Sequence, residues 1–175
     1  MMDVIVLYET GEGQTRKIAT VITEQIRGLD HSATLVNTAD KSASLPLETA
    51  DKVILAAPVH ERRHPATFEA TLSAARQQLE ARPTLMLSVS LKAAFPEGRE
   101  EAQDYLTEMA MRTGFKPTQE ALVAGAVRPG SYDYFQSQVV RHVALAGHDI
   151  ELTEGIREYT DWAALERTVT LFLEA

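Results

Sequence analysis

Short apolar runs alternate with stretches of helical periodicity along most of the chain. Residues Val4–Tyr8 form a continuous β-rich run, as expected of a strand buried on both faces of a parallel sheet. Four later runs predict further strands, at residues 33–36, 53–57, 85–89 and 121–126. Pro58 lies just beyond the third of these runs and is expected to end that strand.

Apolar residues spaced three or four apart predict the helices between these strands. The first predicted helix ends at Gly28, and a later one ends at Gly114. One helix between them is predicted from the spacing of four apolar residues, Phe68, Leu72, Ala75 and Leu79. The last helix is expected to start near Thr160, whose hydroxyl suits an N-cap, and to run to the C-terminus.

This alternation predicts an α/β fold, with a doubly wound five-stranded parallel sheet and helices on both faces. The expected strand order is 2-1-3-4-5, and in such a sheet a ligand binds beyond the carboxyl ends of the strands. Residues 1–175 are interpreted as one domain, because the length suits a single core and no linker divides it. Residues 127–158 are too many for an ordinary connection and predict an insertion between the fifth strand and the last helix.

Charge and composition narrow the range of partners. The formal net charge of −8 argues against nucleic acid, because binding to a phosphate backbone needs a basic surface. The sequence has no cysteine, which excludes disulfides, iron–sulfur ligation and thiol chemistry. No apolar run approaches the length of a membrane span, and the first residues do not resemble a signal peptide. These features predict a cytoplasmic protein.

The segment Thr10–Thr15, which reads Thr-Gly-Glu-Gly-Gln-Thr, lies between the first strand and the first helix. Its two glycines allow backbone N–H groups to turn toward an anion, and the helix that follows adds its own unpaired N–H groups. The two threonine hydroxyls can complete a shell around phosphate oxygens. No lysine stands where a Walker loop needs one, and Arg16 occupies the place of the third glycine of a dinucleotide site. The loop therefore predicts a site for a phosphate monoester.

The same loop has a simpler interpretation, in which the glycines only form a tight turn and Thr10 caps the helix. Glu12 also counts against a phosphate, because a carboxylate beside a dianion is unfavourable unless it points to solvent. The phosphate site is nevertheless the favoured interpretation.

The loop, together with Lys17-Ile18-Ala19, resembles the phosphate loop of flavodoxins. The chain is more similar still to the flavodoxin-like, menaquinone-dependent protoporphyrinogen IX oxidases of bacterial heme synthesis. Asp51–Ala57 resembles the third strand of that family, and Ser88–Leu91 resembles its fourth. The likeness includes Ala124–Arg128 before the insertion and Glu158–Trp162 after it, so it covers nearly the whole chain.

This resemblance implies a flavodoxin-like fold that binds FMN, oxidises protoporphyrinogen IX and passes the electrons through the flavin to a quinone. The flavin carries the chemistry, so no catalytic side chain is assigned. The residues implied at the FMN phosphate are Thr10, Gly11, Glu12, Gly13, Gln14 and Thr15. Those implied beside the flavin ring are Pro58, Val59, His60 and Glu61 on one side, and Ser88, Val89, Ser90, Leu91 and Lys92 on the other. Substrate contacts are expected from Arg62, Arg63, Arg128 and Tyr132.

Two stretches depart from the family pattern. After the third strand the chain reads His60-Glu61-Arg62-Arg63-His64, so only an imidazole or a guanidinium can stack where relatives commonly place an aromatic ring. This stretch is either a solvated loop or a basic rim for the flavin or for the carboxylates of a porphyrin. The insertion, residues 127–158, is acidic in its second half, which opposes anionic lipid. Packing on its own domain therefore competes with weak contact to a membrane surface.

Three functions are compatible with these features. The first is an FMN-dependent oxidoreductase that takes a porphyrinogen or another small redox substrate, with a quinone or a redox protein as electron partner. The second is an electron-transfer flavodoxin, which the acidic charge suits but which gives the insertion no purpose. The third is a flavodoxin-like module that has lost the flavin. The first would be cytoplasmic, and peripheral at the inner face of the cell membrane if the insertion meets lipid.

No metal is expected in any of these functions. His142, His148, Asp149 and Glu151 do not have the spacing of a known metal site.

Overall fold

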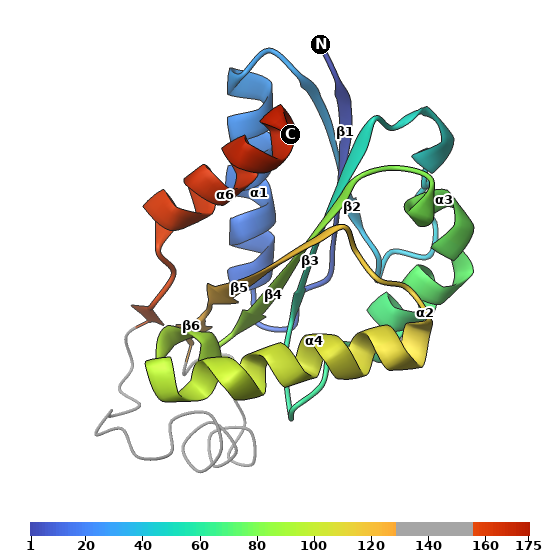
Figure 1. The fold of residues 1–175 in the computed structure, drawn as a ribbon. Coiled ribbons are helices and arrows are strands. Elements are labelled where there is room, and N and C mark those ends of the chain that lie inside the picture. The colour runs from blue at the N-terminus through green and yellow to red at the C-terminus, as the bar shows by residue number, and fades with distance from the viewer. Residues whose placement is uncertain (129–155) are drawn as a thin grey trace.

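A parallel sheet of five strands, in the order β2-β1-β3-β4-β5, forms the centre of the fold (Figure 1). The computed structural model describes residues 1–128 and 156–175. The strands are β1 (Asp3–Tyr8), β2 (Ser32–Asn37), β3 (Lys52–Pro58), β4 (Thr84–Ser90) and β5 (Gln119–Ala124). All four pairings in this sheet are parallel, which confirms the α/β fold and the strand order expected from the sequence.

Helices cover both faces of the sheet (Figure 1). Helices α1 (Gln14–Gly28) and α6 (Trp162–Glu174) lie on one face. The other face is covered by α2 (Ala66–Ala74), α3 (Arg76–Glu80) and α4 (Arg99–Thr113). Short 3₁₀ turns are η1 (Leu47–Thr49), η2 (Lys92–Ala94) and η3 (Pro96–Gly98). Because each face has its own apolar core, the central strands are apolar at successive positions, and Val6 and Leu7 of β1 are both fully buried.

The helix expected over residues 68–79 is in fact two helices, α2 and α3, which meet at Ala75. Ala75 has φ −97° and ψ 11°, outside the helical region. The interruption is one residue wide, since the Ala75 N–H still donates to Thr71 O and the Leu79 N–H donates to Ala75 O. The apolar spacing therefore continues across the break, and periodicity alone could not detect it.

Three other boundaries differ from the expectations. Pro58 is the last residue of β3 and lies two residues beyond the end of its pairing with β1, at Tyr8 and Ala56. Strand β5 ends at Ala124, and the apolar run continues into a separate antiparallel ribbon of β6 (Ala126–Val127) and β7 (Arg157–Glu158). The N-cap of α6 is Asp161, whose carboxylate accepts from the Ala164 N–H at 3.0 Å. Thr160 cannot take that role, because its hydroxyl donates to Ala124 O at 2.6 Å.

A buried lysine ties the start of β3 to the end of α6. Lys52 is 6% exposed. Its Nζ donates to the backbone oxygens of Phe172 at 2.7 Å, Leu173 at 3.1 Å and Ala175 at 2.8 Å. The last carbonyls of a helix have no partners within the helix, and they carry the negative end of its dipole. One ammonium group therefore satisfies three acceptors and fixes α6 against the sheet.

Replacing this lysine should destabilise the fold. In Lys52→Met the chain keeps its apolar stem but leaves three carbonyls without a donor, so we expect the free energy of unfolding to fall by about 2–4 kcal/mol. Urea denaturation followed by circular dichroism measures this. Lys116→Met, at an exposed position, is the matched control and should change stability by less than about 0.5 kcal/mol. Equal stability of the two variants would show that the Lys52 contacts contribute nothing.

Candidate functional site

Three loops follow the carboxyl ends of β1, β3 and β4 and lie next to one another at one edge of the sheet. Backbone bonds continue the strand pairing into them, since the Glu9 N–H donates to Ala56 O at 3.1 Å and the Val59 N–H to Val89 O at 2.8 Å. The loops are residues 9–13, 59–65 and 91–98. The fold thus brings together the segments predicted to hold the phosphate and those predicted to border the ring.

The loop before α1 is shaped as an anion site. Gly13 is the N-cap of α1 and has φ 109°, a conformation that favours glycine. Among the residues that the structure describes, no side chain caps this end of the helix. The Thr10 hydroxyl accepts from the Gly13 N–H at 2.9 Å. Thr10 therefore stabilises the turn of the loop, and it is not itself the N-cap. A side chain at Gly11 would meet only open space. The first N–H groups of α1 are therefore available to an anion at this end.

Thr15 supplies a hydroxyl to the same place. The residue is 2% exposed and lies in the first turn of α1. Within residues 1–128 and 156–175 its side chain makes no hydrogen bond. The hydroxyl oxygen is not among the buried polar atoms that lack a partner, so it is open to a ligand at the start of the helix. A phosphate oxygen beside the helix start would satisfy it, so the donors of this loop suit a phosphate group.

Gln14 does not direct its side chain to the anion position. Its amide nitrogen donates to Glu158 Oε2 and to Thr160 Oγ1, both at 3.1 Å. Its amide oxygen accepts from Arg128 Nη2 at 2.6 Å. Only the backbone N–H of Gln14 is left for a phosphate. The side chain instead connects the start of α1 to the β6–β7 ribbon, at the two ends of the insertion.

Glu158 is the centre of that connection. Its carboxylate accepts from Lys17 Nζ at 2.7 Å and from the Trp162 ring nitrogen at 2.7 Å, besides Gln14. The hydrogen bond from Lys17 is the main cause that lowers the pKa of Glu158 below its usual value. Lys17 is therefore already paired with a carboxylate, that of Glu158.

Glu12 faces the neighbouring loop. Its Oε1 lies 3.6 Å from Nδ1 of His60, which follows β3. The carboxylate that counted against a phosphate is therefore directed toward the loop after β3, where an imidazole stands opposite it.

The loop after β3 is a tight turn built from unusual residues. His60 and Arg63 exchange two backbone hydrogen bonds, of 2.9 and 3.2 Å. The two residues between them, Glu61 and Arg62, have φ values of 51° and 68°. This is a type I′ geometry, for which Asn-Gly is preferred, and side chains there cost free energy. The sequence contains no glycine or asparagine in this stretch, so the turn could not have been read from it.

Arg62 and Lys92 converge on one carboxylate. Arg62 Nη1 is 3.3 Å from Glu101 Oε1, and Lys92 Nζ is 3.4 Å from Glu101 Oε2. Tyr105 also donates to Glu101, at 2.7 Å. The hydrogen bond from Tyr105 and the two cations lower the pKa of Glu101. The loops after β3 and β4 are therefore bridged by a residue of α4 that the sequence did not single out.

Arg63 pairs with a different carboxylate, that of Glu69 in α2. Its Nε lies 3.3 Å from Glu69 Oε2, and Arg112 lies 2.7 Å from the other oxygen of Glu69. Burial opposes ionisation of Glu69, but the two arginines outweigh it and lower its pKa. Arg63 is thus a partner of α2, and its guanidinium does not join the pair of cations on Glu101.

His64 and Ser88 form the buried base of this loop. His64 Nε2 lies 2.9 Å from Ser88 Oγ, and burial lowers the pKa of His64 to about 4, so the imidazole is neutral near pH 7. Ser88 is fully buried, so its hydroxyl bonds within the protein and does not face a ligand. Val89 and Ser90 are also buried in β4, whereas Leu91 and Lys92 are partly exposed beyond it. Any contact of this segment to a ring would come chiefly from its last residues.

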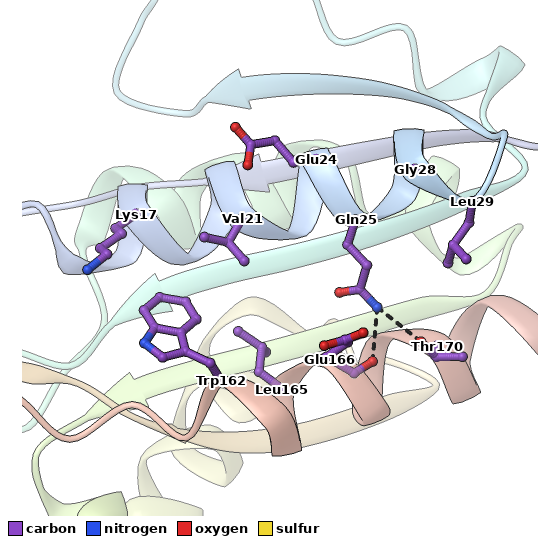
Figure 2. Close-up of a pocket in the computed structure, with 10 residues that line it drawn as sticks. All are labelled: Lys17, Val21, Glu24, Gln25, Gly28, Leu29, Trp162, Leu165, Glu166 and Thr170. Carbon is purple, nitrogen blue, oxygen red and sulfur yellow. Dashed lines mark hydrogen bonds between the residues drawn. The ribbon is translucent and has the colours of Figure 1, made fainter.

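A groove of about 600 Å³ lies between α1 and α6, away from these loops (Figure 2). Gln25 crosses it to the carbonyl oxygen of Glu166 and to the hydroxyl of Thr170, both at 3.0 Å. At the other end Lys17 Nζ lies 5.3 Å from the ring centroid of Trp162. These contacts join the two helices across the groove, and Trp162 packs α6 against α1.

Some expectations fall on residues for which the structure gives no description. Tyr132 and the histidines and acidic residues considered as metal ligands lie between residues 129 and 155. In the described residues on either side of that gap, no three acidic or histidine side chains are grouped to hold a metal ion. Over the same residues, no helix is long and apolar enough to cross a membrane.

Comparison with known proteins gives the family of this fold. The family model described as a flavodoxin domain matches residues 5–150. Protoporphyrinogen IX dehydrogenase (quinone) of Escherichia coli K12 is 24% identical over 163 residues, which are 92% of this chain and 89% of that protein. The apo form of an NADH:FMN oxidoreductase superposes with a TM-score of 0.59 at 14% identity, covering 98% of this chain and 88% of the other. A flavoprotein in complex with FMN from Lactobacillus acidophilus NCFM has a TM-score of 0.51 at 13% identity, covering 70% and 93%. The chain belongs to the flavodoxin-domain family.

Proposed function

We propose that this protein is an FMN-dependent oxidoreductase that oxidises protoporphyrinogen IX and delivers the electrons to a quinone. The relative from Escherichia coli that bears this activity in its name is matched over nearly its full length. The flavodoxin domain and the likeness to an NADH:FMN oxidoreductase also support a flavin-dependent oxidoreductase. The observation that carries the proposal is the convergence of Arg62 and Lys92 on one carboxylate, because the substrate is itself a carboxylate-bearing ring.

The cofactor end of the site is assigned to the loop before α1. The FMN phosphate would be held by the first N–H groups of α1 and by the hydroxyls of Thr10 and Thr15. The ring would lie toward the loops after β3 and β4, which follow the neighbouring strands. FMN, when bound, supplies the capacity to accept electrons from the substrate, and the protein supplies position and charge.

The substrate end is assigned to the cations on Glu101. A propionate of the porphyrinogen would take the place of the Glu101 carboxylate between Arg62 and Lys92, since both are groups of the same charge and shape. Arg63 is left out of this assignment because Glu69 holds it. The contact of Tyr132 with substrate stays a prediction.

The first test is the visible spectrum of the purified protein. We expect flavin absorption bands, or their appearance on titration with FMN. Colourless protein that FMN does not titrate would leave only the third function, a module that has lost the flavin. Oxidation of protoporphyrinogen with a quinone as acceptor then separates the enzyme from an electron carrier, since a carrier would bind FMN and show no such turnover.

Thr15→Ala should weaken FMN binding by about 10-fold, because one hydrogen bond to a charged phosphate is lost. Quenching of FMN fluorescence measures the dissociation constant. Thr20→Ala is the control, because Thr20 lies on the same helix but is exposed, and its hydroxyl donates to Arg16 O. Unchanged affinity in Thr15→Ala would mean that the phosphate lies elsewhere.

Substitutions at the substrate end should act in opposite directions. Arg62→Gln should raise the KM for protoporphyrinogen about 10-fold, because a charge-assisted contact to the propionate is lost. Glu101→Gln should lower KM, because the internal carboxylate that competes for Arg62 and Lys92 is neutralised. Steady-state kinetics with a saturating quinone measures both.

Arg76→Gln is the control for these two, since Arg76 is paired with Glu80 on the exposed side of α3 and should leave KM unchanged. A rise of KM in Glu101→Gln equal to that in Arg62→Gln would show that Glu101 only supports the loop.

A further inference from the structure

We infer that Arg128 binds the phosphate of the flavin nucleotide, so that the residue leading into the insertion forms part of the cofactor site. The inference rests on the proposed binding of FMN. It differs from the expectation that Arg128 contacts the substrate, because the guanidinium lies at the phosphate loop.

The position of Arg128 is defined by two observations. Its Nη2 donates to Gln14 Oε1, in the first turn of α1, at 2.6 Å. A Cβ placed on Gly13 would lie 3.6 Å from Nη1 and 3.8 Å from Cζ of the same arginine. Gly13 is the N-cap of α1. The guanidinium therefore rests against the loop at the end of the helix where N–H groups are unpaired.

The charge of Arg128 fills a requirement that the loop itself does not meet. Residues 9–15 contain two glutamates and no basic residue. Glu12 lies within this loop, and its charge opposes a phosphate dianion. Arg16, the next cation along α1, is exposed, and Lys17 after it is paired with Glu158 at 2.7 Å. Arg128 brings a positive charge to Gly13 from a distant part of the sequence.

The present partner of Arg128 in the loop is one that a phosphate can displace. Gln14 Oε1 is a neutral acceptor, whereas a phosphate offers charged oxygens in the spacing that a guanidinium binds with two parallel hydrogen bonds. Gln14 is also held through its amide nitrogen by Glu158 and Thr160, so it stays in place if Arg128 turns to the ligand.

The arrangement joins the cofactor to both ends of the insertion. Arg128 follows β6 directly, and Glu158 is the last residue of β7. The two strands pair through Ala126 with Glu158 and Val127 with Arg157. Both Arg128 and Glu158 contact Gln14. A phosphate held by Arg128 would thus fix the paired ribbon from which the insertion departs.

The test compares two ligands that differ only in the phosphate. Dissociation constants of FMN and riboflavin are measured for the wild-type chain and for Arg128→Gln by fluorescence quenching. We expect Arg128→Gln to bind FMN about 30-fold more weakly, with riboflavin affinity unchanged within about twofold. Arg128→Lys should recover part of the FMN affinity, since the charge is kept and the second hydrogen bond is lost. Raising the salt concentration should weaken FMN binding in the wild type more than in Arg128→Gln.

Three results would count against the inference in different ways. Equal losses for FMN and riboflavin would show that Arg128 only supports the fold, and unchanged FMN affinity would show that it does not meet the phosphate. A wild-type chain that binds neither flavin would overturn the proposed function and this assignment with it.

Arg157→Gln is the matched control, because Arg157 lies in the same ribbon and stacks on Tyr159, 5.3 Å from its ring centroid. Its FMN affinity should equal that of the wild type.

Discussion

The parallel pairing of β1, β3 and β4 is the constraint on which the site depends. Parallel neighbours end at the same edge, so three loops that are far apart in the sequence meet there. The free N–H groups of α1, the Glu61-Arg62 turn and the segment around Lys92 occupy adjacent positions for this reason alone. Glu101 of α4 and Glu158 of the β6–β7 ribbon add contacts to this edge from elements farther along the chain.

Carboxylates from these elements pair with cations and other donors, and each carboxylate connects segments that are not adjacent in the sequence. Glu101 of α4 bridges the loops after β3 and β4, and Glu158 of the ribbon joins α1 to α6 through Lys17 and Trp162. Each carboxylate has several donors, which offsets the cost of taking its charge partly out of water. Glu101 therefore helps to position the loops after β3 and β4, and Glu158 helps to position the start of α1.

The sequence predicted the sheet and the position of the loop before α1 because both depend on local patterns, and the binding of a phosphate by that loop stays a prediction. A continuous apolar run predicts a strand buried on two faces, and glycines before an amphipathic helix predict an anion site. The partners of Arg62 and Arg128 depend on tertiary distance, and no spacing along the chain shows them. The turn at Glu61 and Arg62 was missed for another reason, since these residues adopt positive φ without the glycine that normally signals it. The ribbon was missed because its strands have two residues each and are separated by the insertion.

The turn between β3 and α2 has a kinetic consequence. Two side chains held at positive φ cost on the order of 1 kcal/mol each, and that free energy is released when the turn opens. Opening of this loop is therefore faster and more frequent than it would be for an Asn-Gly turn of the same shape. Because Arg62 is carried by the turn, its guanidinium can change position with the loop without separating the sheet from its helices.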